Sequence, residues 1–150
     1  MRQRQRPRRT ASRSVLIDTS AFYALADPTD AQNIPAKKIA RRLTTERWLL
    51  VTTNFIQAEA HALILNRLGH RVADRFLAAL RASPATTIVQ VTPGDEERAL
   101  ALIARYQDKD FSLVDATSFV VMERLGISVA FCFDRNFTQY RIEVFDLDKL

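Results

Sequence analysis

The stretch Val15-Leu-Ile-Asp-Thr-Ser-Ala-Phe22 combines a short apolar run with an acid and two hydroxyl residues. An apolar run of this length is typical of a buried β-strand, and the residues after it have the pattern of a helix. Asp18 lies at the junction, where a buried carboxylate is costly unless it is paired or binds a metal. We therefore expect a strand at residues 15–18 that carries a functional acid at its end.

The same alternation of short apolar runs with longer helical patterns continues along the chain. A strand that alternates with a helix in this way is typical of β-α units around a parallel sheet. The sequence therefore predicts an α/β fold with five strands in a single domain, residues 15–150. We expect strands at residues 15–18, 49–52, 88–91, 129–133 and 142–145, and helices at residues 20–26, 36–45, 55–68, 71–83, 94–106 and 113–125.

The cysteine and glycine counts exclude several classes of protein. The one cysteine, Cys132, has no partner for an internal disulfide, which is typical of a reduced, cytoplasmic protein. The three glycines are too few for a dinucleotide-binding fingerprint or a phosphate-binding P-loop. No apolar run approaches the ~18 residues of a membrane-spanning helix. We expect a soluble cytoplasmic protein without a membrane partner.

The net charge of +5 is concentrated near the N-terminus. Residues 1–14 hold six of the 22 basic residues and no acid, which leaves 16 basic and 17 acidic side chains for the rest of the chain. Such a segment has too few apolar side chains to fold alone, so we expect a disordered Arg-rich tail at residues 1–14. Two interpretations of this tail stay open, a phosphate contact and a solvated leader.

Four acids are expected where the carboxyl ends of the strands meet the helices that follow them. In parallel α/β sheets this edge carries the functional site. Carboxylates that converge there repel one another unless a cation lies between them, and oxygen ligands without a Cys or His cluster favour Mg²⁺ or Mn²⁺. The implied chemistry is hydrolysis of a phosphodiester by water that the metal activates. The four acids are Asp18, Glu59, Asp115 and Asp134.

Three of the acids also have a purely structural interpretation. Asp115 is expected to form a capping box with Ser112 at the start of a helix, and Asp134 is placed to form an Asx turn after a strand. Glu59 fits a solvated face of an amphipathic helix. Ser118 lies three residues after Asp115 on the same helix face and is a candidate supporting residue for the site.

Four segments taken together resemble the PIN-domain ribonucleases, and most closely the VapC-like toxins of type II toxin-antitoxin systems. Their order and spacing, which extend from about residue 15 to residue 145, are more specific than any single segment. The segments are Val15-Leu-Ile-Asp-Thr-Ser-Ala-Phe22, Asn54-Phe-Ile-Gln-Ala-Glu59, Phe111-Ser-Leu-Val-Asp-Ala-Thr-Ser-Phe119 and Phe131-Cys-Phe-Asp-Arg-Asn-Phe137.

The resemblance implies a three-layer α/β/α fold around a central, mostly parallel five-stranded sheet. It also implies that the four acids bind Mg²⁺, for which Mn²⁺ substitutes, and that Ser20 supports Asp18 by hydrogen bonding. Further implications are RNA cleavage, a homodimer and inhibition by a small antitoxin protein. The chain departs from the family pattern at Asn136, where many members have a histidine.

The predicted function is that of a metal-dependent endoribonuclease, the toxin of a toxin-antitoxin pair. One alternative is a non-catalytic PIN-like module that binds RNA or serves as a scaffold. Another is a phosphatase that uses Asp18 as a nucleophile, although Ser20 stands where such an enzyme needs a second acid. The sequence does not show which RNA is cut, since recognition depends on the shape of the site.

Overall fold

The computed structural model describes residues 13–149, and in it one sheet of five strands forms the centre of the protein. The strands lie in the order β3-β2-β1-β4-β5, and all four neighbouring pairs are parallel. This confirms the predicted α/β class, the five strands and the parallel sheet. The strands are β1 (Ser14–Ile17), β2 (Leu49–Thr53), β3 (Thr86–Val89), β4 (Val129–Phe131) and β5 (Glu143–Val144).

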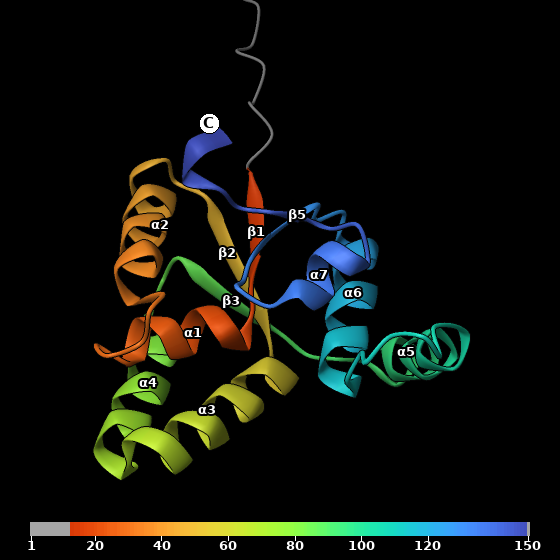
Figure 1. Ribbon diagram of the computed structural model, residues 1–150, viewed down its shortest axis with the longest axis horizontal. Helices are drawn as coiled ribbons and strands as arrows, with labels where there is room; N and C mark the ends of the chain where they lie inside the picture. Colours follow the sequence, from red (N-terminus) through yellow and green to blue (C-terminus); the bar gives the residue numbers. More distant parts are fainter. Residues whose placement is uncertain (1–12, 150) are drawn as a thin grey trace, which may run out of the picture.

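Helices cover both faces of the sheet, which confirms the three-layer α/β/α fold. Figure 1 shows α1, α2 and α4 on one side of the strands and α5 and α6 on the other. The helix α3 lies at the foot of the sheet in this view and contacts α1, α4 and α6. The helices are α1 (Thr19–Ala26), α2 (Asn33–Thr45), α3 (Asn54–Leu68), α4 (His70–Ala82), α5 (Pro93–Arg105), α6 (Leu113–Leu125), α7 (Arg135–Gln139) and the 3-10 turn η1 (Leu147–Lys149).

The third and fourth strands each end two residues earlier than expected, because side chains replace the sheet as hydrogen-bond partners. The third strand was placed at residues 88–91, but the amide of Val91 donates to Asn54 Oδ1 (2.8 Å) and leaves the ladder. The fourth was placed at residues 129–133, but the amide of Phe133 donates to Ser20 Oγ (2.9 Å). The helix α7 was not predicted, because five residues are too few to show a helical period.

The predicted Arg-rich tail falls mostly on residues 1–12, which lie outside the described residues. Its last two residues are described. Ser14 is the first residue of β1 and pairs with Leu49, so the strand begins one residue before the expected position. The guanidinium of Arg13 lies 5.0 Å from the centre of the Trp48 ring. No helix within residues 13–149 is long and apolar enough to cross a membrane.

The core is densest around β1, the middle strand. Val15 and Leu16 have no exposed surface, and the flanking strand contributes Phe131, which is 1% exposed. Burial on both faces is the reason that this strand is a continuous apolar run. Both neighbours of β1 are parallel to it, so the carboxyl ends of β2, β1 and β4 lie along one edge of the sheet.

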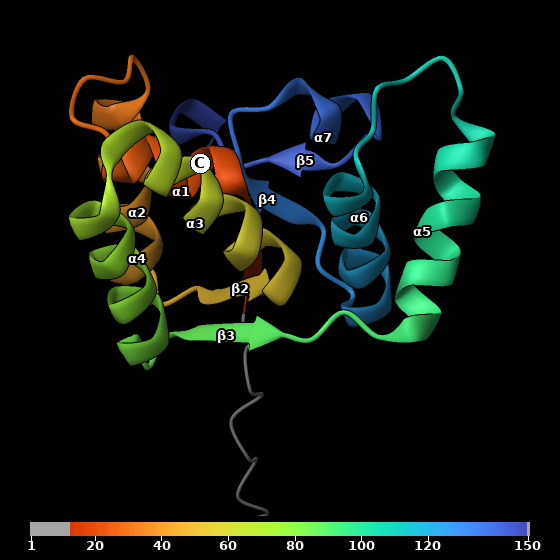
Figure 2. The same cartoon turned by 90° about the horizontal axis from the view of Figure 1, so that it is seen from below.

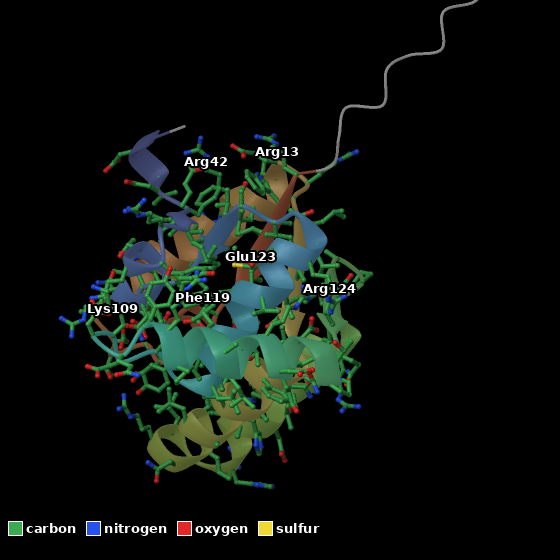
Figure 3. The ribbon with its side chains drawn as sticks, turned by 90° about the vertical axis from the view of Figure 1, so that its right-hand side faces the viewer. Arg13, Arg42, Lys109, Phe119, Glu123 and Arg124 are labelled. Atoms are coloured by element: carbon green, nitrogen blue, oxygen red, sulfur yellow. The ribbon has the colours of Figure 1, made fainter. Side chains whose placement is uncertain are left out.

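A buried ion pair joins α5 to α6. Asp95 has no exposed side-chain surface and accepts from Arg124 Nε (2.9 Å) and Nη2 (2.8 Å). It also closes the capping box of α5 with Thr92. These bonds, chiefly those from Arg124, lower the pKa of Asp95 to about 2. In Figure 3, Arg124 lies beside α5, the helix that carries Asp95.

Replacement of Arg124 by Met is expected to lower the free energy of unfolding by roughly 2 kcal/mol, because the buried carboxylate of Asp95 loses its two-point partner. Urea denaturation at pH 7 measures this change. The control is Arg98→Met, since the side chain of Arg98 is 61% exposed and makes one 3.3 Å contact to the same carboxylate. Equal effects of the two substitutions would show that the two-point contact between Arg124 and Asp95 adds no more to the free energy of unfolding than the exposed Arg98 contact does.

Candidate active site

Asp18 directly follows β1 and is the N-cap of α1. Its side chain is almost fully buried at 3% exposure, and Oδ2 accepts from the amide of Ser20 (3.2 Å) and from Ser20 Oγ (2.9 Å). Burial raises the pKa of Asp18 to about 6, while the two hydrogen bonds from Ser20 lower it. The negative charge of Asp115 raises it further, so the two acids lie close enough to repel each other.

Asp115 lies in the first turn of α6 and is 7% exposed. The predicted capping box with Ser112 is confirmed, since each residue's side chain accepts from the other's amide (both 3.0 Å). A second donor arrives from far along the chain, because Asn136 Nδ2 donates to Asp115 Oδ2 (2.8 Å). Within residues 13–149, no hydrogen bond ends on the other oxygen, Oδ1. That oxygen is available to a ligand.

Asp134 is the N-cap of α7, and its Oδ1 accepts from the amide of Asn136 (2.9 Å). The predicted Asx turn after the fourth strand is therefore present. The backbone amide of Asn136 thus donates to Asp134, and its side-chain Nδ2 donates to Asp115. Ser20 makes a second link between the chain segments, because its Oγ donates to Asp18 and accepts from the amide of Phe133 (2.9 Å).

Hydrogen bonds group three of the acids, because Asn136 bonds Asp115 and Asp134, and Ser20 bonds Asp18 and the amide of Phe133, the residue before Asp134. The thiol of Cys132 is buried beside them. Burial raises the pKa of this thiol, and the negative charges of Asp18, Asp134 and Asp115 raise it further. Three of the four predicted acids therefore lie around the end of β4. They come from β1, from α6 and from the turn before α7, which are far apart in sequence.

Glu59 and Ser118 are placed differently. Glu59 lies on α3 and is half-buried, and no contact in the described part of the chain links it to the other three acids. Ser118 lies on α6 with no exposed surface, and its Oγ donates to the carbonyl oxygen of Val114 (2.7 Å). Interactions that the structure shows therefore link Asp18, Asp115 and Asp134, and the place of Glu59 in the site stays a prediction.

The donor set at this edge suits a hard divalent cation. The carboxylates of Asp18 and Asp115 are both buried and repel each other, and a cation between them would remove that repulsion. As the side chains stand, no three acid, His or Cys side chains within residues 13–149 are close enough together to enclose a metal. In this arrangement the carboxylate oxygens accept hydrogen bonds from Ser20, from the amide of Ser112 and from Asn136, and Oδ1 of Asp115 accepts none of them.

Sequence reasoning missed the role of Asn136. The sequence shows Asn136 only as a departure from a family pattern, whereas its side chain joins α7 to Asp115. The Asp-Arg-Asn order does signal the local Asx turn. Nothing in the sequence signals the second bond, because the two partners are 21 residues apart.

Comparison with known families shows to which family this fold belongs. Residues 15–143 match the model of the PIN domain. The chain belongs to the PIN domain family. The "23S rRNA-specific endonuclease VapC20" of Mycobacterium tuberculosis is 35% identical over 124 residues, which cover 83% of this chain and 92% of that protein. The "VapC ribonuclease" of Archaeoglobus fulgidus is 30% identical over 118 residues, which cover 77% of this chain and 74% of that protein.

A solved structure supports the same relation. The crystal structure of Mycobacterium tuberculosis VapC20, described as a toxin that cleaves the sarcin-ricin loop, has a TM-score of 0.77 against this protein. The match is 34% identical and covers 85% of this chain and 95% of that one. This chain is therefore similar to VapC20 in both sequence and fold.

Replacement of Asp18 by Asn tests how far the buried negative charge of Asp18 destabilises the fold. A buried acid whose pKa is raised from 3.8 to about 6 destabilises the fold progressively as pH rises through that interval. We expect the variant to melt at a higher temperature than the wild type at pH 8 in EDTA, with a smaller difference at pH 4. Thermal melts across pH measure this. Asp108→Asn is the control, because that side chain is 75% exposed, and a pH-independent gain for Asp18→Asn would contradict the explanation.

Replacement of Asn136 by Ala is expected to lower the free energy of unfolding by roughly 1–2 kcal/mol, since Asp115 loses a hydrogen bond to its charged oxygen. A double-mutant cycle with Asp115→Asn separates this bond from other effects of the substitution. Denaturant unfolding of the four proteins in EDTA gives the coupling energy. Additive effects would show that the bond between the two side chains does not stabilise the site.

Proposed function

We propose that this protein is a metal-dependent endoribonuclease that hydrolyses RNA phosphodiester bonds, with Mg²⁺ as its cofactor and Mn²⁺ as a substitute. The observation that carries the proposal is the convergence of Asp18, Asp115 and Asp134 at one edge of a PIN domain sheet. The names of the related proteins, "23S rRNA-specific endonuclease" and "VapC ribonuclease", support the reaction class.

Asp18, Asp115 and Asp134 are the residues that would hold the cation, and Glu59 is proposed as a fourth ligand that reaches it from α3. When bound, the cation supplies Lewis acidity at the scissile phosphate and lowers the pKa of a water. Ser20 restrains Asp18 through two hydrogen bonds to one carboxylate oxygen. Asn136 restrains Asp115 in the same manner, with one bond. Ser118 is proposed as a support for α6, through its bond to Val114.

The alignment of acids with helix N-termini contributes to this function. Asp18 and Asp134 are N-caps, and Asp115 lies in the first turn of α6. The partial positive charge of each helix N-terminus favours the ionised form of a nearby carboxylate. Each acid is thereby held in one orientation by backbone amides, so that little ordering is left to occur when substrate binds.

We further propose that this ribonuclease is the toxin of a toxin-antitoxin pair, that it forms a homodimer and that it acts in the cytoplasm. The similarity to VapC20, a protein described as a toxin, supports the first part. The free, buried Cys132 is in keeping with a reducing compartment. Co-purification with a small partner protein encoded beside this gene tests the pairing, and light scattering tests the dimer.

Replacement of Asp115 by Asn is expected to lower the rate of RNA cleavage at least about 100-fold, because a charged group at the reacting centre is lost. Purified wild type and variant are compared on a mixed RNA pool in Mn²⁺, in Mg²⁺ and in EDTA. Asp108→Asn, which removes the same charge from an exposed loop, is expected to cleave as the wild type does. The Asp115→Asn protein, purified in parallel, also reveals contaminating nucleases, because their cleavage would persist in that variant.

The three buffers distinguish the alternatives. Cleavage by the wild type in Mn²⁺ or Mg²⁺ that EDTA abolishes supports the proposed function. RNA binding without cleavage, together with no effect of Mn²⁺ on the melting temperature, would instead support the non-catalytic module. An aspartyl-phosphate trapped at Asp18 would support the phosphatase.

A further inference from the structure

The short helix α7 is held against one face of α6. Asp115, Phe119 and Glu123 follow one another at four-residue intervals along α6, so their side chains lie on the same face of that helix. Asn136, in α7, and Tyr140, the C-cap of α7, are also four residues apart, and both meet this face. In Figure 2, α7 lies beside α6. The two helices therefore meet along a row of side chains that begins at a proposed metal ligand.

Three contacts make up this row. At the first turn of α6, Asn136 Nδ2 donates to Asp115 Oδ2 (2.8 Å). One turn further along, the ring of Tyr140 stacks on the ring of Phe119, with centres 4.4 Å apart and an angle of 7° between the planes. The hydroxyl of Tyr140 then donates to Glu123 Oε1 (2.7 Å). Figure 3 labels Phe119 and Glu123 on α6.

The helix α7 depends on such contacts because it has little stability of its own. Its five residues are too few for an isolated helix to persist in water. The end of the helix is also unfavourable, since Arg141 adopts a left-handed φ of 65° at a position where glycine is favoured. Tertiary contacts therefore decide where α7 lies, and with it the side chain of Asn136.

Two other contacts fix the start and the middle of this segment. The amide of Phe133 donates to Ser20 Oγ (2.9 Å) just before α7. Phe137 has no exposed surface and packs edge-to-face on Phe119, with ring centres 5.1 Å apart. Two fixed points leave a short helix free to turn about the line that joins them. The stack of Tyr140 on Phe119 supplies a third point and removes that freedom.

We propose that Tyr140 is a positioning residue of the proposed metal site. Its stack on Phe119 holds α7 in the orientation in which Asn136 reaches Asp115. The bond from Tyr140 to Glu123 is exposed, so water competes for both groups and the stack is the decisive contact. The inference rests on the proposed function, because it assigns to Tyr140 the support of a metal ligand that it does not itself contact.

The bond between Asn136 and Asp115 serves as the measure of position. A double-mutant cycle of Asn136→Ala with Asp115→Asn gives the coupling between the two side chains. The cycle is measured by urea denaturation in EDTA in three backgrounds, with Tyr140, with Tyr140→Phe and with Tyr140→Leu. Phe keeps a ring for the stack, whereas Leu removes it. We expect Tyr140→Phe to retain the coupling and Tyr140→Leu to lose most of it.

The affinity for Mn²⁺ is the second measure, determined by isothermal titration calorimetry on the full-length protein. Loss of a group that holds a metal ligand in place typically weakens metal binding roughly 10–100-fold. We expect Tyr140→Leu to raise the Kd for Mn²⁺ about 10-fold, at the low end of that range, because Tyr140 acts through Asn136. Tyr140→Phe is expected to bind Mn²⁺ as the wild type does.

The matched control is Tyr23→Leu. Tyr23 lies on α1 in a separate apolar cluster with Ile64 and Ala73, and its hydroxyl also donates to a carboxylate, that of Asp27 (2.6 Å). This substitution is expected to lower the melting temperature and to leave both the coupling and the Kd for Mn²⁺ unchanged. Circular dichroism confirms that each variant folds.

Full coupling in Tyr140→Leu would overturn the inference. Equal loss in Tyr140→Phe and Tyr140→Leu would also overturn it, because Phe keeps the stack. The same holds for an equal loss in Tyr23→Leu, since a general loss of stability would then explain the result. Loss of coupling in Tyr140→Leu with an unchanged Kd for Mn²⁺ would show that Tyr140 serves the fold alone, which contradicts the proposed role.

The two measures separate this inference from the function on which it rests. If the wild type binds Mn²⁺ and cleaves RNA while Tyr140→Leu keeps the coupling, only the inference fails. If the wild type neither binds Mn²⁺ nor cleaves RNA, the proposed function fails, and the coupling in EDTA still decides whether Tyr140 positions Asn136 on Asp115.

Discussion

The end of the central strand is the point on which the rest of the structure depends. The amide of Asp18 donates to the carbonyl oxygen of Phe131 (3.1 Å), which joins the end of β1 to the end of β4. The carboxylate of the same residue caps α1, and Ser20 in that helix accepts from the amide of Phe133. One short segment therefore ends a strand, begins a helix and sets where the neighbouring strand leaves the sheet.

This arrangement has an electrostatic cost that suits a binding site. A carboxylate buried among apolar strands would be more stable in its neutral form, and the pKa of Asp18 rises to about 6 for that reason. The fold offsets part of the cost with donors from Ser20, and it treats Asp115 in the same way with donors from Ser112 and Asn136. Residues that cap helices and stabilise the fold are thus also the residues that we propose as metal ligands.

The sequence predicted the architecture because that architecture follows from local patterns. Each apolar run, such as residues 15–17, can be recognised as a strand from its local sequence. The alternation of these runs with helices predicts a parallel sheet. Boundaries were less predictable. The ends of β3 and β4 depend on the side chains of Asn54 and Ser20, which compete with the ladder for backbone amides and come from distant parts of the chain.

The sequence by itself therefore determined the α/β class and the parallel sheet, and it predicted four acids at one edge of that sheet. The tertiary structure decided how those acids are linked. Ser20 joins Asp18 to the amide of Phe133, next to Asp134, across 113 residues of the chain. It also decided that Asn136 holds Asp115. The physical reason is that strand order and helix packing set distances between side chains, and no local pattern of residues encodes those distances.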